Sequence, residues 1–236
     1  MGSLGSVGLG SNVMATPTDT SKNAEYTNQF LAETGVDVSS TIVTKVDGEI
    51  LKNTYDVMTQ QMLLYPEYTS QMKNIQDLAN NRAFAATNGS DMRTNIGYFG
   101  NINTLEAMYN YDVSNGFHPA GTTWRDIVTH EMGHVVTRGI INKMFDNDAD
   151  RNAAWHSGEV SRDILRNAVK EVQDNYKAYG FKTKPTSPQL RSDISKYATH
   201  NADESIAEAW ADYHANGNNS KALSRAIYNE MRKRMS

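Results

Sequence analysis

The chain has 236 residues, with 27 acidic and 23 basic side chains, a formal net charge of −4 and no cysteine. This length suits one domain with an arm, and the charge gives no basic footprint for nucleic acid. No stretch reaches the roughly 18–20 consecutive apolar residues that a membrane-spanning helix needs. Without cysteine, disulfides, thiolate nucleophiles, iron–sulfur clusters and thiolate zinc sites are excluded, so any metal site must use His, Asp and Glu.

Residues 1–40 are rich in Gly, Ser, Thr and Asn and show no sustained hydrophobic period, so we expect a flexible arm. The first residues have no basic segment and no continuous apolar segment, and we expect no signal peptide. An arm of this kind is usually ordered only when a partner holds it. The arm is therefore compatible with a larger assembly, and the location stays open.

Hydrophobic spacing predicts a helix over residues 49–64, which Pro66 ends. Further elements are expected before residue 121: a short helix over 68–79, strands over 82–87 and 94–99 around the turn signal Asn88-Gly89-Ser90, and a strand followed by a turn of helix over 102–111.

After Gly121 the pattern becomes strongly helical. Thr122 or Thr123 is expected to cap a helix over 124–145, whose apolar positions form one buried stripe. The remaining predicted elements are a helix that begins at Ser157 or Ser161 and ends near Gly180, a loop over 181–192, and helices over 202–215 and 220–234. Together these patterns predict a mostly helical α+β fold with a small mixed sheet.

The sequence His130-Glu131-Met132-Gly133-His134 lies in the middle of the predicted helix 124–145. Histidines at positions i and i+4 lie one above the other on the same helix face, which suits two ligands of one tetrahedral Zn²⁺ ion. Glu131 is expected beside that metal, where it can take a proton from a water molecule and pass it to a leaving amine. The motif therefore predicts His130 and His134 as zinc ligands and Glu131 as the general base.

A zinc site of this kind needs a third protein ligand and one open position. In metzincins a glycine and a further histidine follow the motif, but Thr137 and Ile140 occupy those positions here, so that class is excluded.

The predicted helix 202–215 offers carboxylates instead. Spacing alone allows two registers. Either Glu204 is the ligand and Glu208 accepts a hydrogen bond from a zinc-bound histidine, or Glu208 is the ligand and Asp212 has the supporting role.

The motif is followed, about 70 residues later, by Tyr197, Asn201, Glu204 and Glu208 at fixed spacing. This arrangement resembles the anthrax-lethal-factor-like zincins and the zincin-like metallopeptidase domains of bacterial toxins and phage-encoded proteins. The resemblance covers about residues 90–216, including an approach to the motif through a short strand at Ile96–Phe99. Trp210 stands where that family usually has phenylalanine, a change that does not touch the chemistry.

The resemblance implies a zincin-like domain over residues 41–236, with an active-site helix, a Zn²⁺ ion and Glu204 as the third ligand. It further implies that Glu208 supports a zinc-bound histidine and that Tyr197 faces the metal, where its phenol would stabilise an oxyanion. The other histidines, namely His118, His156, His200 and His214, are expected on loops or on the surface. Among these four, His200 is the first candidate for a contact with a substrate or with a metal ligand, because it lies between Tyr197 and Glu204.

Two main functional hypotheses follow. The first is a zinc-dependent endopeptidase that acts on a peptide or protein, with the substrate adding in extended form to strand 94–99. The second is a structural or binding component of a phage particle or secretion assembly that retains the zincin fold and has little or no peptidase activity. A third and weaker hypothesis is a toxin module that cleaves one protein of a host or competitor.

Overall fold

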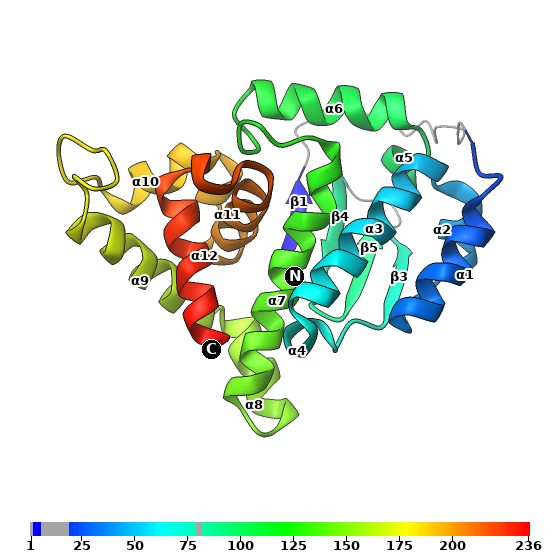
Figure 1. Ribbon diagram of the computed structural model, residues 1–236, viewed down its shortest axis with the longest axis horizontal. Coiled ribbons are helices and arrows are strands. Elements are labelled where there is room, and N and C mark those ends of the chain that lie inside the picture. Colours follow the sequence, from blue (N-terminus) through cyan, green and yellow to red (C-terminus); the bar gives the residue numbers. More distant parts are fainter. Residues whose placement is uncertain (1, 6–18, 79–81) are drawn as a thin grey trace. The chain divides into compact units, whose positions relative to one another are not determined.

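A computed structural model describes residues 2–5, 19–78 and 82–236 of the chain (Figure 1). The chain forms two compact units: unit 1 consists of Met1–Asp112 and Thr123–Gly139, and unit 2 of Val113–Thr122 and Ile140–Ser236. The structure is mostly helical with one small mixed sheet, which confirms the predicted α+β class. In the described part of the chain, no helix combines the length and apolarity needed to cross a membrane.

The sheet lies in unit 1 and has the strand order β1-β4-β5-β3-β2. Its strands are β1 (Gly2–Gly5), β2 (Asp37–Val38), β3 (Asn74–Asp77), β4 (Ala83–Thr87) and β5 (Asp91–Thr94). Strands β1, β4 and β5 pair antiparallel, whereas β3 pairs parallel with both β5 and β2. The strand predicted over 82–87 and the turn at Asn88-Gly89-Ser90 are confirmed: Asn88 Oδ1 accepts the backbone N–H groups of Ser90 and Asp91 at 3.0 and 2.7 Å.

Unit 1 also contains helices that cover this sheet and its connections. They are α1 (Asn23–Thr34), α2 (Ser40–Lys45), α3 (Gly48–Leu64), α4 (Pro66–Thr69), α5 (Ile96–Phe99), most of α6 (Ile102–Ser114), the 3₁₀ turn η1 (Trp124–Asp126) and α7 (Ile127–Met144) as far as Gly139. Helix α1 packs on α3 through stacked rings of Phe30 and Tyr55, whose centroids are 4.3 Å apart. The Thr27 hydroxyl also lies 2.7 Å from the Tyr55 hydroxyl.

Several predictions for unit 1 are wrong. The arm expected over residues 1–40 contains α1 and β2, although residues 6–18 lie outside the described part. The helix expected over 68–79 is replaced by α4 and β3, because β3 gains ladder hydrogen bonds from β2 and β5 that local spacing does not reveal. The segment expected as a strand followed by a turn of helix over 102–111 is helical throughout.

The strand expected over 94–99 is also wrong, since the strand is β5 and residues 96–99 form α5. Asn95 makes this switch: its side-chain oxygen accepts the Gly97 N–H at 3.0 Å and its side-chain nitrogen donates to the Ala83 carbonyl at 3.0 Å. Because β5 lies between β4 and β3, it offers no open edge. The expectation that a substrate adds to this strand is therefore withdrawn.

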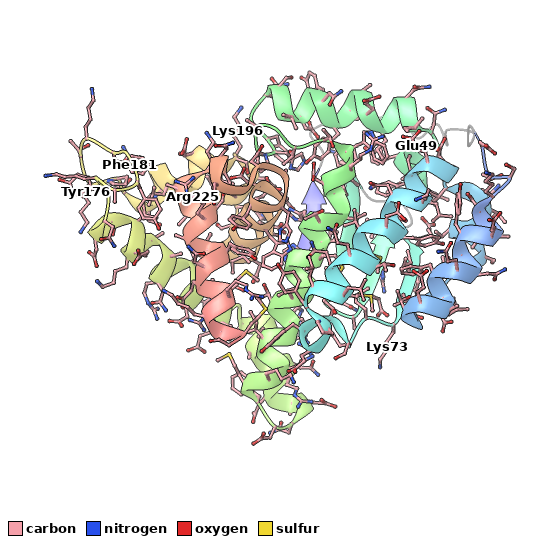
Figure 2. All side chains as sticks on the ribbon, in the orientation of Figure 1. Glu49, Lys73, Tyr176, Phe181, Lys196 and Arg225 are labelled. Carbon is pink, nitrogen blue, oxygen red and sulfur yellow. The ribbon has the colours of Figure 1, made fainter. Side chains whose placement is uncertain are left out.

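Unit 2 is helical. Its elements are the end of α7, α8 (Asp148–Ser157), α9 (Glu159–Asp174), α10 (Ser187–Ile194), η2 (Tyr197–Thr199), α11 (Ala202–Asn216), η3 (Gly217–Asn219) and α12 (Ala222–Arg234). Helices α9, α11 and α12 pack on one another, and α10 packs on α11 and α12. Figure 2 labels Tyr176 and Phe181 on the loop after α9, and Arg225 on α12.

In unit 2 the helices predicted over 202–215 and 220–234 are confirmed, and two boundaries are corrected. Helix α9 ends at Asp174 rather than near Gly180. The segment 181–192 is not all loop, because Thr186 begins α10 with a capping box in which the Gln189 side chain accepts the Thr186 N–H at 2.8 Å. Helix α8 is a separate element that the sequence pattern did not indicate.

Candidate metal centre

The helix with the His-Glu-x-x-His motif begins in a capping box at Thr123. The Thr123 hydroxyl accepts the Arg125 N–H at 3.3 Å, and the Asp126 carboxylate accepts the Thr123 N–H at 2.8 Å. This geometry selects Thr123 over Thr122 as the cap. Burial raises the pKa of Asp126, an effect that the hydrogen bonds from Thr123 oppose. Arg125 also pairs with Glu49, which Figure 2 labels, at 2.6 Å.

Every residue of α7 from 127 to 137 is buried. His130, Glu131 and His134 are 1%, 0% and 2% exposed, and the two imidazole ring centroids are 5.1 Å apart. A surface helix with solvated histidines would leave these rings in water. The burial of these three side chains therefore excludes a solvated helix face for the motif.

Close backbone contacts within unit 1 hold α7 in place. A Cβ atom on Gly139 would lie 2.1 Å from the carbonyl oxygen of Tyr68, so only glycine allows α7 to approach α4 this closely. The Gln71 side chain donates to the carbonyls of Val135 and Tyr68 at 2.8 and 3.1 Å. These contacts fix the position of α7, and with it the motif, within unit 1.

Helix α11 carries the predicted carboxylates of unit 2. Asn201 caps the helix, with its side-chain oxygen accepting the Glu204 N–H at 2.8 Å, and this cap orients the first turn. Residues 204 to 212 are all buried, with Glu204 and Glu208 at 2% and 1% exposed. The helix is therefore an internal element of its unit and not a solvated acidic face.

Glu208 lies in a buried polar network with His118 and Ser195. One carboxylate oxygen of Glu208 is 3.2 Å from His118 Nδ1, and the other accepts from the Ser195 hydroxyl at 2.7 Å. A carboxylate only accepts, so this contact places a proton on His118 Nδ1. The Ser195 oxygen in turn accepts the Ala198 N–H at 2.9 Å.

His118 lies on the loop that follows α6, as expected, but its side chain is 1% exposed, so it is not a surface residue. Sequence spacing could not show the contact, since His118 and Glu208 are 90 positions apart. The one signal was its place in the loop at residues 115–123, directly before the motif helix.

Asp212 was the supporting residue in the second register. Its two carboxylate oxygens accept from the Asn216 side chain and from the Lys221 N–H, both at 2.8 Å. These contacts tie the end of α11 to the start of α12, which gives Asp212 a structural role at this connection.

Tyr197 is half-buried in η2, among aromatic rings of its own unit. Its ring centroid lies 5.1 Å from that of Phe117 and 6.0 Å from that of His118, and it stacks at 6.0 Å on His200. Tyr197 thus lies beside the His118–Glu208 pair, while its expected role toward a metal stays a prediction.

The remaining histidines differ from one another. His156 and His200 are exposed, as expected. His214 is half-buried: its Nδ1 lies 2.8 Å from the Trp210 carbonyl, its ring centroid is 4.6 Å from that of Trp210, and burial lowers its pKa.

His130, His134 and Glu204 form a buried group in which one ligand atom from each residue lies within 4.8 Å of the others. Such a group could hold a metal ion. It contains Glu204 and not Glu208, which favours the first of the two registers.

Comparisons of the chain with family models, with curated proteins and with solved structures find no match. The function proposed below therefore rests on the residues of the site.

Proposed function

We propose that this protein is a zinc-dependent endopeptidase with a zincin-like fold, in which His130, His134 and Glu204 hold the metal. The observation that carries the proposal is the buried group of these three residues, with the buried Glu131 on the same helix as the two histidines. Two imidazoles and one carboxylate are the ligand set of catalytic zinc sites, which keep a fourth position open. A purely structural site would not require a glutamate at position 131.

When bound, Zn²⁺ would polarise the peptide carbonyl and lower the pKa of a water molecule toward about 7. Glu131 accepts the proton of the attacking water and then delivers it to the nitrogen of the leaving amine. The Tyr197 phenol donates a hydrogen bond to the carbonyl oxygen as negative charge develops on it. The Glu208 carboxylate fixes the tautomer and orientation of His118, whose ring lies beside that of Tyr197.

The substitution Glu131→Gln tests this mechanism, because it keeps the size of the side chain and removes the base. We expect zinc content and thermal unfolding close to those of the wild type, with a loss of hydrolysis of about 10²–10⁴-fold. Hydrolysis is measured with casein and a quenched peptide library, with and without a chelator. Glu106→Gln, the same change at an exposed glutamate of α6, is the matched control and should keep full activity.

Full activity of Glu131→Gln would overturn the mechanism. Zinc bound at one equivalent without cleavage of any substrate by the wild type would instead favour the second hypothesis, a structural or binding component of an assembly. A measurement of metal content therefore accompanies every activity assay.

A further inference from the structure

A groove of about 760 Å³ lies in unit 2 along helix α9 and also touches α8, α10 and the start of α11. Four cationic side chains line it, and Asp203 is the one carboxylate among its lining residues. The cations are Arg162, Arg166, Lys170 and Arg191, and we call the surface that they form the basic groove. The sign of this surface is opposite to the net charge of −4 of the whole chain.

Three of the cations come from consecutive turns of one helix. Arg162, Arg166 and Lys170 are exposed and repeat every four residues along α9, so they share a face. Leu165 and Val169 also line the groove and are 8% and 7% exposed, which gives it an apolar floor beneath the charges.

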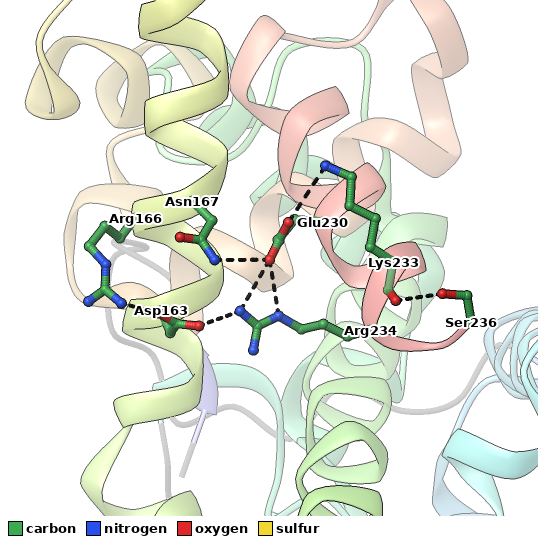
Figure 3. A network of polar contacts seen from close by, with 7 residues as sticks. All are labelled: Asp163, Arg166, Asn167, Glu230, Lys233, Arg234 and Ser236. Atoms are coloured by element: carbon green, nitrogen blue, oxygen red, sulfur yellow. Dashed lines mark hydrogen bonds and ion pairs between the residues drawn. The ribbon is translucent and has the colours of Figure 1, made fainter.

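Acidic neighbours do not neutralise this row of charges. Figure 3 shows that Asp163 accepts from both Arg166 and Arg234, while Arg234 also bonds Glu230 at 3.1 Å. Lys233 approaches the same Glu230 at 3.9 Å, so the network holds three cations and two carboxylates. Arg166, at 72% side-chain exposure, is the cation of this network that lines the groove.

At the other end of the row, Lys170 pairs with Asp174, which also lies 3.8 Å from Lys184. Glu171 acts on Lys170 as well, so two carboxylates face these two ammonium groups. The excess of positive charge on this face of α9 therefore lies at Arg162 and Arg166.

The other two cations donate to neutral acceptors. Arg162 donates to the Ser157 carbonyl at 2.7 Å. Arg191 donates to the carbonyls of Ala198 and Asn201 at 2.9 and 3.0 Å, and to the Ser205 hydroxyl at 2.9 Å. These contacts hold the guanidinium groups in place and leave their charges to act on whatever enters the groove.

We propose that the basic groove binds an acidic peptide segment in extended conformation, with carboxylates at alternate positions. The row repeats every four helical residues, about 6 Å at 1.5 Å per residue. Side chains on one side of an extended peptide repeat every two residues, about 6.6–6.8 Å. Successive carboxylates can thus meet successive cations, and the aliphatic parts of the peptide can lie on Leu165 and Val169.

The lining favours a peptide over a single-stranded nucleic acid. Binding of single strands relies on aromatic side chains on which bases stack, and His156 is the one aromatic ring among the residues that line the groove. Amide and hydroxyl groups of Gln173, Ser187 and Asn201 also line it and can pair with a peptide main chain. This inference concerns binding alone and does not depend on the proposed hydrolysis.

The test uses the full chain carrying Glu131→Gln, so that a peptide probe stays intact even if the wild type cleaves it. The probe is a labelled peptide of alternating Glu and Ser, and its matched partner has Gln in place of Glu. We expect the Glu peptide to bind at low salt and its affinity to fall steeply with added salt, because the contacts are exposed charge pairs. The Gln peptide should bind at least tenfold more weakly.

The variant Arg162→Gln/Arg166→Gln/Lys170→Gln should weaken binding of the Glu peptide by about tenfold or more, as expected for the loss of three exposed pairs. The control Lys177→Gln/Lys182→Gln/Lys196→Gln removes the same charge from exposed lysines outside the groove and should change affinity less than twofold. Circular dichroism checks that both variants fold, and Arg162→Gln alone should give an intermediate loss.

Equal losses in the two triple variants would overturn the proposal, as would equal affinity for the Glu and Gln peptides. Tighter binding of an oligothymidylate of the same charge would overturn it in favour of nucleic acid. Since hydrolysis is absent from this design, failure of the groove leaves the proposed peptidase untouched, and failure of the peptidase leaves the groove untouched.

Discussion

In unit 1, the helix that carries His130 and His134 is held through its backbone: Gly139 touches the Tyr68 carbonyl, and Gln71 bonds the carbonyl of Val135. In unit 2, the carboxylates of α11 are held through side chains. Glu208 bonds His118 and Ser195, and Asn201 caps the turn that carries Glu204.

This difference has a physical consequence. A helix fixed by close backbone contact tolerates no added volume at the contact, whereas a buried polar network is also sensitive to the loss of a single donor or acceptor. We therefore expect small steric changes to disturb the histidines of unit 1. Changes of charge or hydrogen bonding should disturb the carboxylates of unit 2.

The largest effect is expected for Glu204→Ala, which removes a charged oxygen ligand. If Glu204 is the third ligand, the variant should lose bound zinc, from about one equivalent to a small fraction, since two imidazoles alone make an incomplete site. Metal content is measured by atomic emission after gel filtration. Glu204→Gln should lose zinc as well, because the amide oxygen is a much weaker ligand than a carboxylate.

Asp212→Asn is the matched control on the same helix. It should keep zinc and lower the free energy of unfolding by about 1–2 kcal/mol, because the carboxylate that bonds Asn216 and the Lys221 N–H is weakened. Zinc loss in Asp212→Asn with retention in Glu204→Ala would shift the site by one helical turn and return to the second register.

The second-largest effect is expected at the close backbone contact between α7 and α4 in unit 1. Gly139→Ala would put a methyl carbon 2.1 Å from the Tyr68 carbonyl oxygen, where no side-chain rotation can relieve the clash. We expect a loss of about 1–3 kcal/mol in the free energy of unfolding, measured in urea, even though alanine favours helix by about 1 kcal/mol over glycine.

Gly116→Ala in unit 2 is the comparison for this variant. Gly116 has φ +68°, and no heavy atom lies within 4 Å of the position that an alanine methyl group would take. The cost of this substitution is therefore that of the left-handed backbone alone, about 1–2 kcal/mol. An unchanged or raised stability of Gly139→Ala would contradict the close approach of α7 to α4.

The chemistry-bearing part of this molecule could be predicted from sequence because it is local. The i, i+4 spacing placed His130 and His134 on one helix face, and the strict periodicity of 202–215 and 220–234 predicted α11 and α12. Both rest on contacts within one turn or two of a helix, and these need no knowledge of the fold.

What could not be predicted depends on partners distant in sequence. β3 exists because β2 and β5 pair with it, and α5 begins because Asn95 bonds Ala83 across the hairpin. His118 is buried against Glu208, which is 90 positions away in the sequence. In each case a local pattern was ambiguous and a tertiary contact decided it.

The smallest effect concerns the half-buried imidazole of His214 in unit 2. His214 lies against Trp210 and Tyr228, and burial lowers its pKa below the ordinary value of 6.5, partly opposed by its bond to the Trp210 carbonyl. The unfolded chain then binds more protons than the folded one as pH falls through 6.5. The stability that the neutral imidazole contributes is present above pH 6.5 and is lost as pH falls toward its lowered folded value.

The measurement is the free energy of unfolding in urea from pH 7.5 to about 5, compared between wild type, His214→Gln and His156→Gln. His214→Gln should flatten the decline below about pH 6.5, whereas His156→Gln, at an exposed position of α8, should follow the wild type. The same decline in all three proteins would mean that protonation of His214 costs the folded state no stability. The aromatic rings around His214 would then have to open to water.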